Sequence, residues 1–561
     1  MGTDNFFYST RHWASSQKHL YWLFVSVLMI PNVFLFFTED MSTWTRVPFL
    51  LMPAAFYMAL MCMCRKPGWS AWILFPMFIL GAFQLVLLYL FGRSIIASDM
   101  FLNLFTTNSG EVGELLGKLM PAIIGVCVLY IPTLAIGVYS ARLKEKLPAS
   151  FRLKTLRNAA IVFALSMPFC LSGKFRITDD IFPANIFYNM GFAFKSWEKS
   201  VKYPQTSAGF TFSAVSERPD TLREVYVMVV GETARATNLG LYGYYRNTTP
   251  MLRKTEGLVT FYDALTQSNT THKSVPMILS DISAENFSDI YARKGILTAF
   301  REAGFSTVFI SNQEPNRSFI DYFAREADNY TNLVIGGHAA YDMVMVDSLA
   351  RIIDRGDKKL LVVLHSHGSH FNYNERYPAS GSYYKPDDVE VVSYREREKL
   401  INAYDNSIRY TDGFLSGLIS VLEERNLPSA LFYCSDHGED LLDDSRRRFL
   451  HASPIPTYYQ IHIPYLWWFS PSYRQLWPEK TAATENNSHK PVSTRNVFHT
   501  MLSVAGINSP YANPCLSVAD TSFIPLKRFY LNDHNLPVPL DSLHLKEKDI
   551  EMFREKGLSY P

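Results

Sequence analysis

The sequence predicts a membrane α-helical domain of five transmembrane helices, followed along the chain by a soluble α/β domain. Two observations predict this division. Residues 1–172 contain five long apolar stretches, and residues 219–561 contain short apolar runs that each end in polar side chains. Residues 173–218 join the two parts. A chain of 561 residues is also too long for a single hydrophobic core.

The apolar stretches of residues 1–172 have the length of membrane-spanning helices, since about 20 apolar residues cross a bilayer as a helix. Prolines inside several of them would kink a soluble helix but are tolerated in packed membrane helices. Buried helices of a soluble protein are the less favoured alternative. The stretches are Leu20–Phe37, Val47–Cys64, Ala71–Phe91, Leu119–Ala141 and Leu156–Leu171.

The positions of the basic residues predict the orientation of these helices. Lys and Arg are concentrated before the first stretch, at Arg65-Lys66 between the second and third, and between residues 142 and 157. Short cytoplasmic loops hold such an excess. Five spans with a cytoplasmic N-terminus place everything after about residue 173 outside the cytoplasm. In a bacterium, this predicts an inner-membrane protein whose soluble domain lies in the periplasm.

Composition excludes some functions and suggests a role for the joining segment. The formal net charge is +2, which gives no indication of a nucleic-acid partner. Four of the six cysteines lie in or beside predicted spans, so no disulfide framework is expected. Residues 173–218 are rich in aromatic residues and lysine, which predicts an interfacial segment at the lipid headgroups. Ordinary packing against the soluble domain is an equal alternative.

The region after Arg223 repeats a pattern of apolar run, polar turn and helix-period sequence, which predicts a parallel α/β sheet. Ligands of such sheets bind outside the carboxyl ends of the strands. The runs are Val225–Val230, Thr307–Ile310, Leu360–Leu364 and Leu431–Cys434. The polar side chains that follow them are Glu232, Asn312, the histidines at 365, 367 and 370, and the pair Asp436-His437. A functional site is therefore expected at this edge.

Two carboxylates and an imidazole, those of Glu232, Asp436 and His437, suit Zn²⁺ or a similar divalent ion. They leave room for a fourth group. The polar segment Gln267–Ser274 follows a short predicted strand near Leu258–Tyr262 and is rich in hydroxyls. Metal coordination is one way to activate a threonine hydroxyl as a nucleophile. On chemistry alone, either threonine of this segment could serve.

These residues and the predicted spans together resemble a known family. The chain is similar to the phosphoethanolamine transferases of Gram-negative inner membranes, which belong to the alkaline phosphatase and sulfatase superfamily. That family includes lipid A modifiers and polymyxin-resistance enzymes. The resemblance spans nearly the whole chain, and its motifs are specific together although each alone is weak. They are Val230 to Arg235, Tyr242-Gly243-Tyr244, Arg246 to Pro250, Thr271 ahead of Ser274 to Met277, His365 to His370, Tyr404-Asp405-Asn406, Ser435 to Glu439, and His451.

The resemblance implies roles for particular residues. Thr271 corresponds to the family's nucleophile, and Glu232, Asp436 and His437 correspond to its zinc ligands, with Thr271 completing the shell. His370 and His451 match a second histidine pair, which would stabilise the transferred phosphate, bind a second zinc or protonate a leaving group. For His365 and His367 we expect a capped, solvated strand end. Asp405 is expected to order a helix start or support the ligands.

A further implied site precedes the fourth span. Asn103, Thr107 and Glu111 recur at four-residue spacing and match positions that hold the ethanolamine phosphate. If this segment is helical, they share one face.

The resemblance implies transfer of phosphoethanolamine from phosphatidylethanolamine to a lipopolysaccharide acceptor, lipid A or core, through a phospho-threonine intermediate. The acceptor stays open, because Met277 stands where lipid A enzymes of the family often have a cysteine. Transfer to a periplasmic glucan or another glycan is one alternative. A phosphoglycerol transferase of the lipoteichoic acid synthase kind, which prefers Mn²⁺, is another. A sulfatase is disfavoured, since the chain lacks a Cys-x-Pro-x-Arg setting.

Overall fold

The computed structural model describes residues 16–38, 43–91, 99, 101, 119–170, 181–316, 318–390 and 392–560. The chain forms two compact units, and their main boundary falls between Ala193 and Phe194. The first unit is helical and the second contains the predicted sheet. The finer division at residues 172 and 218 stays a prediction.

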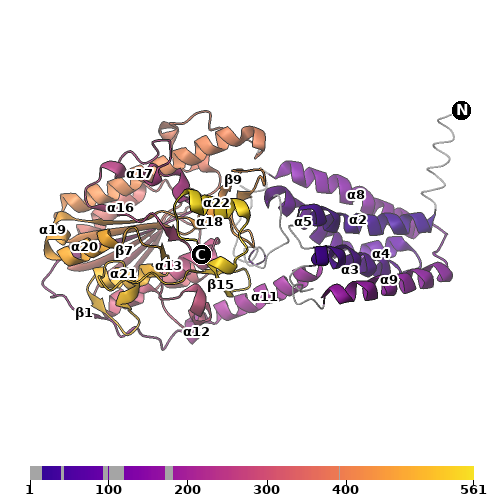
Figure 1. The fold of residues 1–561 in the computed structure, drawn as a ribbon, viewed down its shortest axis with the longest axis horizontal. Coiled ribbons are helices and arrows are strands. Elements are labelled where there is room, and N and C mark those ends of the chain that lie inside the picture. The colour runs from indigo at the N-terminus through magenta and orange to yellow at the C-terminus, as the bar shows by residue number, and fades with distance from the viewer. Residues whose placement is uncertain are drawn as a thin grey trace. The chain divides into compact units, whose positions relative to one another are not determined.

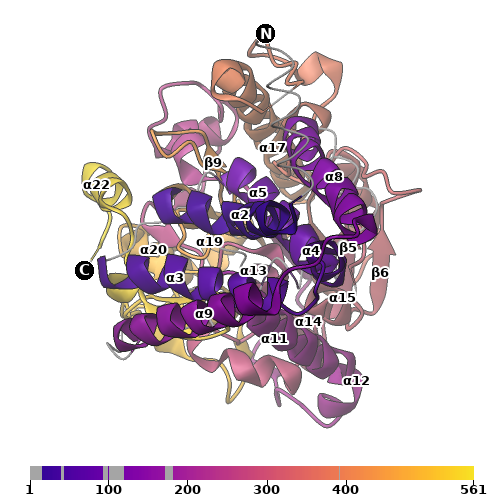
Figure 2. The ribbon, with the colours of Figure 1, turned by 90° about the vertical axis from the view of Figure 1, so that its right-hand side faces the viewer.

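The first unit contains three helices long and apolar enough to cross a membrane within the described residues: α2 (Gln17–Thr38), α3 (Thr43–Met61) and α8 (Met120–Arg142). A fourth is reached if the bent pair α4 (Pro67–Ile73) and α5 (Phe75–Phe91) counts as one span. A further 22-residue helix, α9 (Ala149–Cys170), carries basic residues in its first turns. Figure 2 shows α3 and α9 side by side. Five spans therefore remain a prediction.

The third apolar stretch, Ala71–Phe91, does not form one continuous helix. The chain bends by 63° between α4 and α5, at Leu74. Pro76 provides the reason, because its nitrogen has no hydrogen to donate to the carbonyl of Trp72 and its ring crowds that carbonyl.

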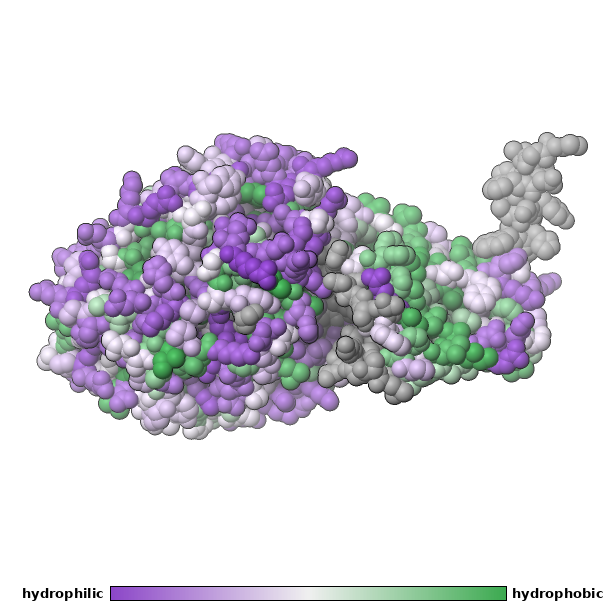
Figure 3. All heavy atoms as spheres, in the orientation of Figure 1, coloured by the Kyte–Doolittle hydropathy of each residue, from purple (hydrophilic) through white to green (hydrophobic). Residues whose placement is uncertain are grey.

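Close packing of α4 against α8 depends on a glycine. A Cβ added to Gly68 would lie 2.1 Å from the carbonyl oxygen of Gly137. The backbone N–H of Gly68 donates to Ser140 Oγ at 3.0 Å, and Gln17 Nε2 donates to the Ser140 carbonyl at 2.8 Å. Small residues that let helix backbones approach, with polar groups bonded between helices, are typical of membrane bundles. Figure 3 shows hydrophobic side chains gathered over the helices of this unit, whereas the visible face of the second unit is mostly hydrophilic.

The segment that joins the two parts contains α11 (Ala184–Val201) and α12 (Tyr203–Thr206). One stripe of α11 presents exposed apolar side chains at three- and four-residue spacing, which places them on one helix face. The interfacial role of this segment stays a prediction. The stripe consists of Phe187, Met190, Phe194, Trp197 and Val201.

The second unit is built on a seven-stranded sheet in the order β3-β11-β8-β2-β7-β5-β6. Strands β8, β2, β7, β5 and β6 are parallel, which confirms the predicted sheet, and β11 runs antiparallel between β8 and β3. The strands are β3 (Leu258–Thr260), β11 (Tyr465–Phe469), β8 (Ser429–Ser435), β2 (Glu224–Gly231), β7 (Lys359–His365), β5 (Ser306–Ser311) and β6 (Asn329–Asn332). Each predicted run lies inside one of these strands.

Helices cover both faces of this sheet (Figure 1). Alternate side chains of β2 show how. Tyr226 and Met228 pack on one face with α13 (Thr271–Ile278), α14 (Ile296–Glu302) and α21 (Asn496–Val504). Val227 and its alternating neighbours pack on the other face with α16 (Val344–Ile353) and α17 (Arg397–Glu424). Because both faces are covered, β2 is buried along its whole length, as a continuous apolar run requires.

Short elements complete the second unit. The proline-rich chain after Ser509 also contains a helix, α22 (Glu547–Glu555). Acidic residues in its first turn and Arg554 in its last turn suit the helix dipole, and Phe553 packs on Tyr458. The other elements are β1 (Val215–Ser216), β4 (Ala264–Leu265), α15 (Phe319–Ala324), β9 (Asp440–Leu441), β10 (Phe449–Leu450), α18 (Tyr458–Ile461), α19 (Pro471–Leu476), α20 (Pro478–Asn487), β12 (Val492–Ser493), β13 (Ile507–Asn508), β14 (Phe529–Leu531) and β15 (Pro537–Pro539).

Candidate active site

The carboxyl ends of two neighbouring strands bring the predicted ligands together. Glu232 directly follows β2, and Asp436 and His437 directly follow β8. All three side chains are buried, and one donor atom of each lies within 4.8 Å of the others. His437 Nε2 is 3.6 Å from Glu232 Oε1 and 3.3 Å from Asp436 Oδ2. The structure therefore assembles the oxygen, oxygen and nitrogen donor set expected from the sequence.

Backbone groups fix the donor atoms of this set. His437 Nδ1 lies 3.0 Å from the Gly438 carbonyl oxygen, so Nδ1 carries the proton and Nε2 presents a lone pair to the cluster. Asp436 Oδ1 accepts from the backbone N–H of Thr233 at 3.0 Å. Thr233 reaches it from a left-handed conformation with φ of 61°, an uncommon state for a β-branched residue.

Burial shapes the protonation of these groups. It lowers the pKa of His437 well below the ordinary value, so the ring is held neutral. It also raises the pKa of the Asp436 carboxyl, against the backbone N–H bonds from Thr233 and His437. Two buried carboxylates beside a neutral imidazole are stabilised by a bound cation. The donor set therefore fits a divalent metal ion that accepts nitrogen and oxygen ligands.

Thr271 joins the same cluster from the first turn of α13. Its Oγ1 lies 3.1 Å from His437 Nε2, and 3.4 and 3.5 Å from the two carboxylate oxygens of Glu232. The Thr271 side chain is half-buried, whereas Thr270 is buried with its hydroxyl 3.2 Å from Ser268 Oγ. Of the two threonines left open on chemistry alone, Thr271 is the one that the fold brings to the donors.

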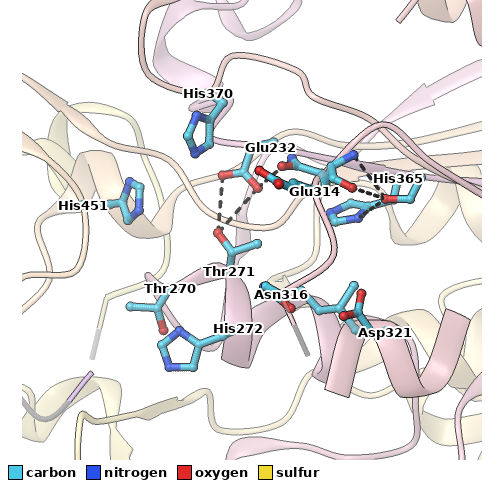
Figure 4. Close-up of a pocket in the computed structure, with 13 residues that line it drawn as sticks. Glu232, Thr270, Thr271, His272, Glu314, Asn316, Asp321, His365, His370 and His451 are labelled. Carbon is cyan, nitrogen blue, oxygen red and sulfur yellow. Dashed lines mark hydrogen bonds between the residues drawn. The ribbon is translucent and has the colours of Figure 1, made fainter. Parts of the chain in front are cut away.

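The second histidine pair lines the cavity beside Thr271 (Figure 4). The rings of His451 and His437 lie 4.1 Å apart, and His451 Nδ1 is 3.5 Å from Glu439 Oε2. Burial, with the positive charge of Arg376 and the neighbouring His451, lowers the pKa of His370 to about 3. Neutral His370 can accept a hydrogen bond from a group bound in the cavity.

His365 is the last residue of β7, and His367 follows the strand. His365 is 1% exposed, and burial lowers its pKa to about 4, so the solvated strand end expected there is wrong. Its ring packs beside Phe309, with the ring centroids 6.5 Å apart, and it also lines the cavity beside Thr271. His367 is half-buried, its Nδ1 lies 3.1 Å from the Asn312 carbonyl oxygen, and burial lowers its pKa well below the ordinary value, so the solvated end expected there is wrong as well.

Two residues that the sequence reasoning did not identify support the site. Gln313 Nε2 donates to Glu232 Oε2 at 3.4 Å and to the Ser366 carbonyl at 2.9 Å, so it ties the ends of β5 and β7 to a ligand. Asp342 accepts the backbone N–H groups of His367 and Gly368 at 2.9 and 2.8 Å. Gln313 directly follows Asn312 at the end of β5, and this position after a strand end could have identified it from the sequence. Asp342 lies ahead of α16, far from any strand end, and offered none.

Other predicted residues have different outcomes. Asn312 does not face the donors; its side-chain amide binds Ala340 and Asp342. Asp405 is buried and accepts from Asn238, Tyr244 and Arg246, which agrees with a supporting role. The predicted substrate residues Asn103, Thr107 and Glu111 lie outside the described residues.

Comparison with known proteins places this geometry in context. A Kdo(2)-lipid A phosphoethanolamine 7''-transferase from Escherichia coli is 29% identical over 314 residues, which cover 54% of this chain and 54% of the relative. The chain thus spans about half the length of the curated relatives it matches. The periplasmic domain of EptC from Escherichia coli is 25% identical with a TM-score of 0.54, over 60% of this chain and 97% of that one.

The structure of an integral membrane protein matches a larger part of this chain than the periplasmic domain does. The integral membrane lipooligosaccharide phosphoethanolamine transferase A from Neisseria meningitidis has a TM-score of 0.69 and 23% identity, over 89% of this chain and 97% of that one. These relatives confirm the resemblance to phosphoethanolamine transferases. The sulfatase family model matches residues 224–507, just over half of the chain. The seven strands of the central sheet, the donor set and Thr271 all lie inside the matched region, and the chain belongs to the sulfatase family.

Proposed function

We propose that this protein is a zinc-dependent transferase that moves phosphoethanolamine from phosphatidylethanolamine to a lipopolysaccharide acceptor, lipid A or core. The observation that carries the proposal is the position of Thr271 Oγ1, within 3.1 to 3.5 Å of His437 Nε2 and the Glu232 carboxylate. The relatives named above, which are phosphoethanolamine transferases, support the choice of group transferred.

The metal is proposed from the donor set. Glu232, Asp436 and His437 would hold Zn²⁺, with Thr271 as the fourth group. When bound, such an ion supplies a Lewis acid that lowers the pKa of the hydroxyl and polarises a phosphoryl oxygen. Zinc is favoured over Mn²⁺ because the set includes an imidazole with its Nε2 lone pair fixed toward the carboxylates.

The proposed reaction is a double displacement at phosphorus. Thr271 Oγ forms a bond to the donor phosphorus, the phosphorus–oxygen bond to diacylglycerol breaks, and diacylglycerol takes up a proton as it leaves. Phosphoethanolamine is then held on Thr271. In the second step, an acceptor hydroxyl or phosphate attacks that phosphorus and releases the threonine. His370 and His451 line the cavity at the reacting centre and are proposed to move the protons and to bind the phosphoryl oxygens.

The proposal places the protein in the inner membrane with its second unit in the periplasm. Here α9 is the fifth span, since its 22 residues extend about 33 Å as a helix. Its basic residues Arg152, Lys154 and Arg157 would reach the cytoplasmic interface by snorkelling. Donor and acceptor lipids then lie in the same outer leaflet, and membrane anchoring raises the effective concentration of both. Asn103, Thr107 and Glu111 are proposed to hold the donor phosphate.

The test is expression of the full chain in a Gram-negative host, with mass spectrometry of lipid A, core and periplasmic glucan. We expect one added phosphoethanolamine unit on lipid A or core, lost in Thr271→Ala and kept in the control Thr270→Ala. Incubation of purified protein with phosphatidylethanolamine alone should leave one such unit on the peptide that contains Thr271. Addition that persists in Thr271→Ala would refute the nucleophile, and addition to glucan alone would refute the acceptor.

A further inference from the structure

The cavity beside Thr271 has two chemically different ends (Figure 4). His370 and His451 stand at one end, close to the proposed phosphoryl position. Glu314, Asn316, Asp321 and His365 line the other end. This second end plays no part in the reaction proposed above, although it opens onto the same nucleophile.

His365 gives this end an unused hydrogen-bond acceptor. Its Nδ1 lies 3.5 Å from Ser311 Oγ, and that hydroxyl lies 3.3 Å from the Gln313 carbonyl oxygen to which it donates. Nδ1 therefore donates to Ser311, and Nε2 is left with a lone pair. His365 is 1% exposed, and its Nε2 has no hydrogen-bond partner among the described residues. A buried polar atom of this kind is normally paired, so its lack of a partner in a cavity wall points to a ligand that donates.

Glu314 adds negative charge to the same wall. Its side chain is half-buried, and it forms no ion pair or hydrogen bond within the described part of the chain. Asp321, on α15, brings a second carboxylate to this end. Carboxylates and an imidazole lone pair are all acceptors. The ligand that fits the Glu314 carboxylate and the His365 lone pair is a cation that donates hydrogen bonds, and a primary ammonium donates three and accepts none.

We propose that Glu314 and His365 form a recognition site for the primary ammonium of the lipid headgroup, and that they select a donor with an amine over one without. This inference rests on the proposed function. Thr271 lines the same cavity as Glu314 and His365, so the two-carbon arm of an ethanolamine phosphate on Thr271 would extend within this cavity, toward the end away from His370 and His451. Glu314 and His365 would then determine which headgroup binds, whereas Thr271, His370 and His451 would carry out the steps at phosphorus.

The test compares two donors with the full-length protein in lipid vesicles. One donor is phosphatidylethanolamine, and the other is phosphatidylglycerol, whose headgroup has no amine. Headgroup transfer is measured for each donor as kcat/KM. In Glu314→Gln we expect the phosphatidylethanolamine value to fall about ten- to a hundredfold, the range for one hydrogen bond to a charged group, while the phosphatidylglycerol value does not fall. His365→Leu should shift the ratio of the two values in the same direction.

The matched control is Glu551→Gln, which removes the same charge from an exposed position on α22 and should leave both values unchanged. Metal content and melting temperature are measured for every variant. Loss of bound metal in Glu314→Gln would identify the residue as a metal ligand and overturn the proposal. An unchanged donor ratio in a folded, metal-loaded Glu314→Gln would also overturn it. Wild-type protein that transfers neither headgroup would refute the proposed function itself.

Discussion

Replacing Gly368 by alanine tests whether the backbone of Glu232 must stay in place for metal binding. Gly368 has a φ of 55°, and a Cβ added there would lie 2.8 Å from the Glu232 carbonyl oxygen and 2.9 Å from its backbone nitrogen. Ordinary van der Waals contact starts near 3.4 Å, so Glu232 would have to move by about 0.6 Å. The left-handed backbone alone costs about 1–2 kcal/mol with a Cβ present.

The matched control is Gly304→Ala. Gly304 has a φ of 86°, but a Cβ there would have no neighbour within 4 Å. In both variants the alanine Cβ makes the left-handed backbone less favourable, which destabilises the folded state. The melting temperature of the detergent-solubilised protein should therefore fall by a few degrees in each. Only Gly368→Ala should also displace a ligand, and we expect its zinc affinity to fall about ten- to a hundredfold, the range for disturbed ligand support. Melting curves and zinc titration with a competing chelator measure the two effects. Equal zinc affinity in both variants would refute the reasoning.

Three further predictions concern the same unit. Asp436→Asn removes a charged donor and should abolish stoichiometric zinc in elemental analysis; zinc retained at one ion per chain would exclude Asp436 as a ligand. Gln313→Ala should weaken zinc binding about tenfold in chelator competition, because Gln313 donates a hydrogen bond to Glu232 Oε2. Gln313→Glu should weaken zinc binding more, because a second carboxylate repels that of Glu232. Equal zinc affinity in wild type and both variants would contradict this reasoning. Burial raises the pKa of Glu326 from 4.5 to about 7, so the folded protein binds more protons there than the unfolded chain and stability falls as the pH rises from 4.5 through 7. Between pH 5 and pH 8 the melting temperature should therefore fall further for wild type than for Glu326→Gln. An equal fall in the two proteins would show that Glu326 does not titrate as described.

The sequence predicted the strands well because they are buried on both faces. A strand such as β2 then reads as an unbroken apolar run, and its polar successor Glu232 marks the carboxyl edge. The contact between Gln313 and Glu232 could not be predicted. It depends on β5 lying two strands away from β2, across β7, and strand order is set by long-range packing. Chemistry alone left Thr270 and Thr271 open for a similar reason, since the start and direction of α13 decide which hydroxyl faces the donors, and only the family resemblance indicated Thr271.

The antiparallel strand β11 escaped prediction, although Trp467 and Trp468 form part of an apolar run. No turn or polar motif in its sequence distinguishes an antiparallel neighbour from another parallel one. The bend at Pro76 was also missed, since a proline in a membrane helix is compatible with a straight or a broken span.

The place of β8 in the sheet has a consequence for fluctuations at the proposed metal centre. Strand β8 pairs with β2 on one side and with β11 on the other, so its backbone amides are bonded along both edges. Amides in such a strand exchange with solvent only when a large part of the domain opens. Asp436 and His437 begin where this strand ends, whereas Thr271 begins a helix of eight residues. Hydrogen exchange should accordingly be slowest in the strand that precedes the two proposed ligands and faster in the segment that carries the Thr271 hydroxyl, so that the proposed nucleophile approaches a nearly stationary set of donors.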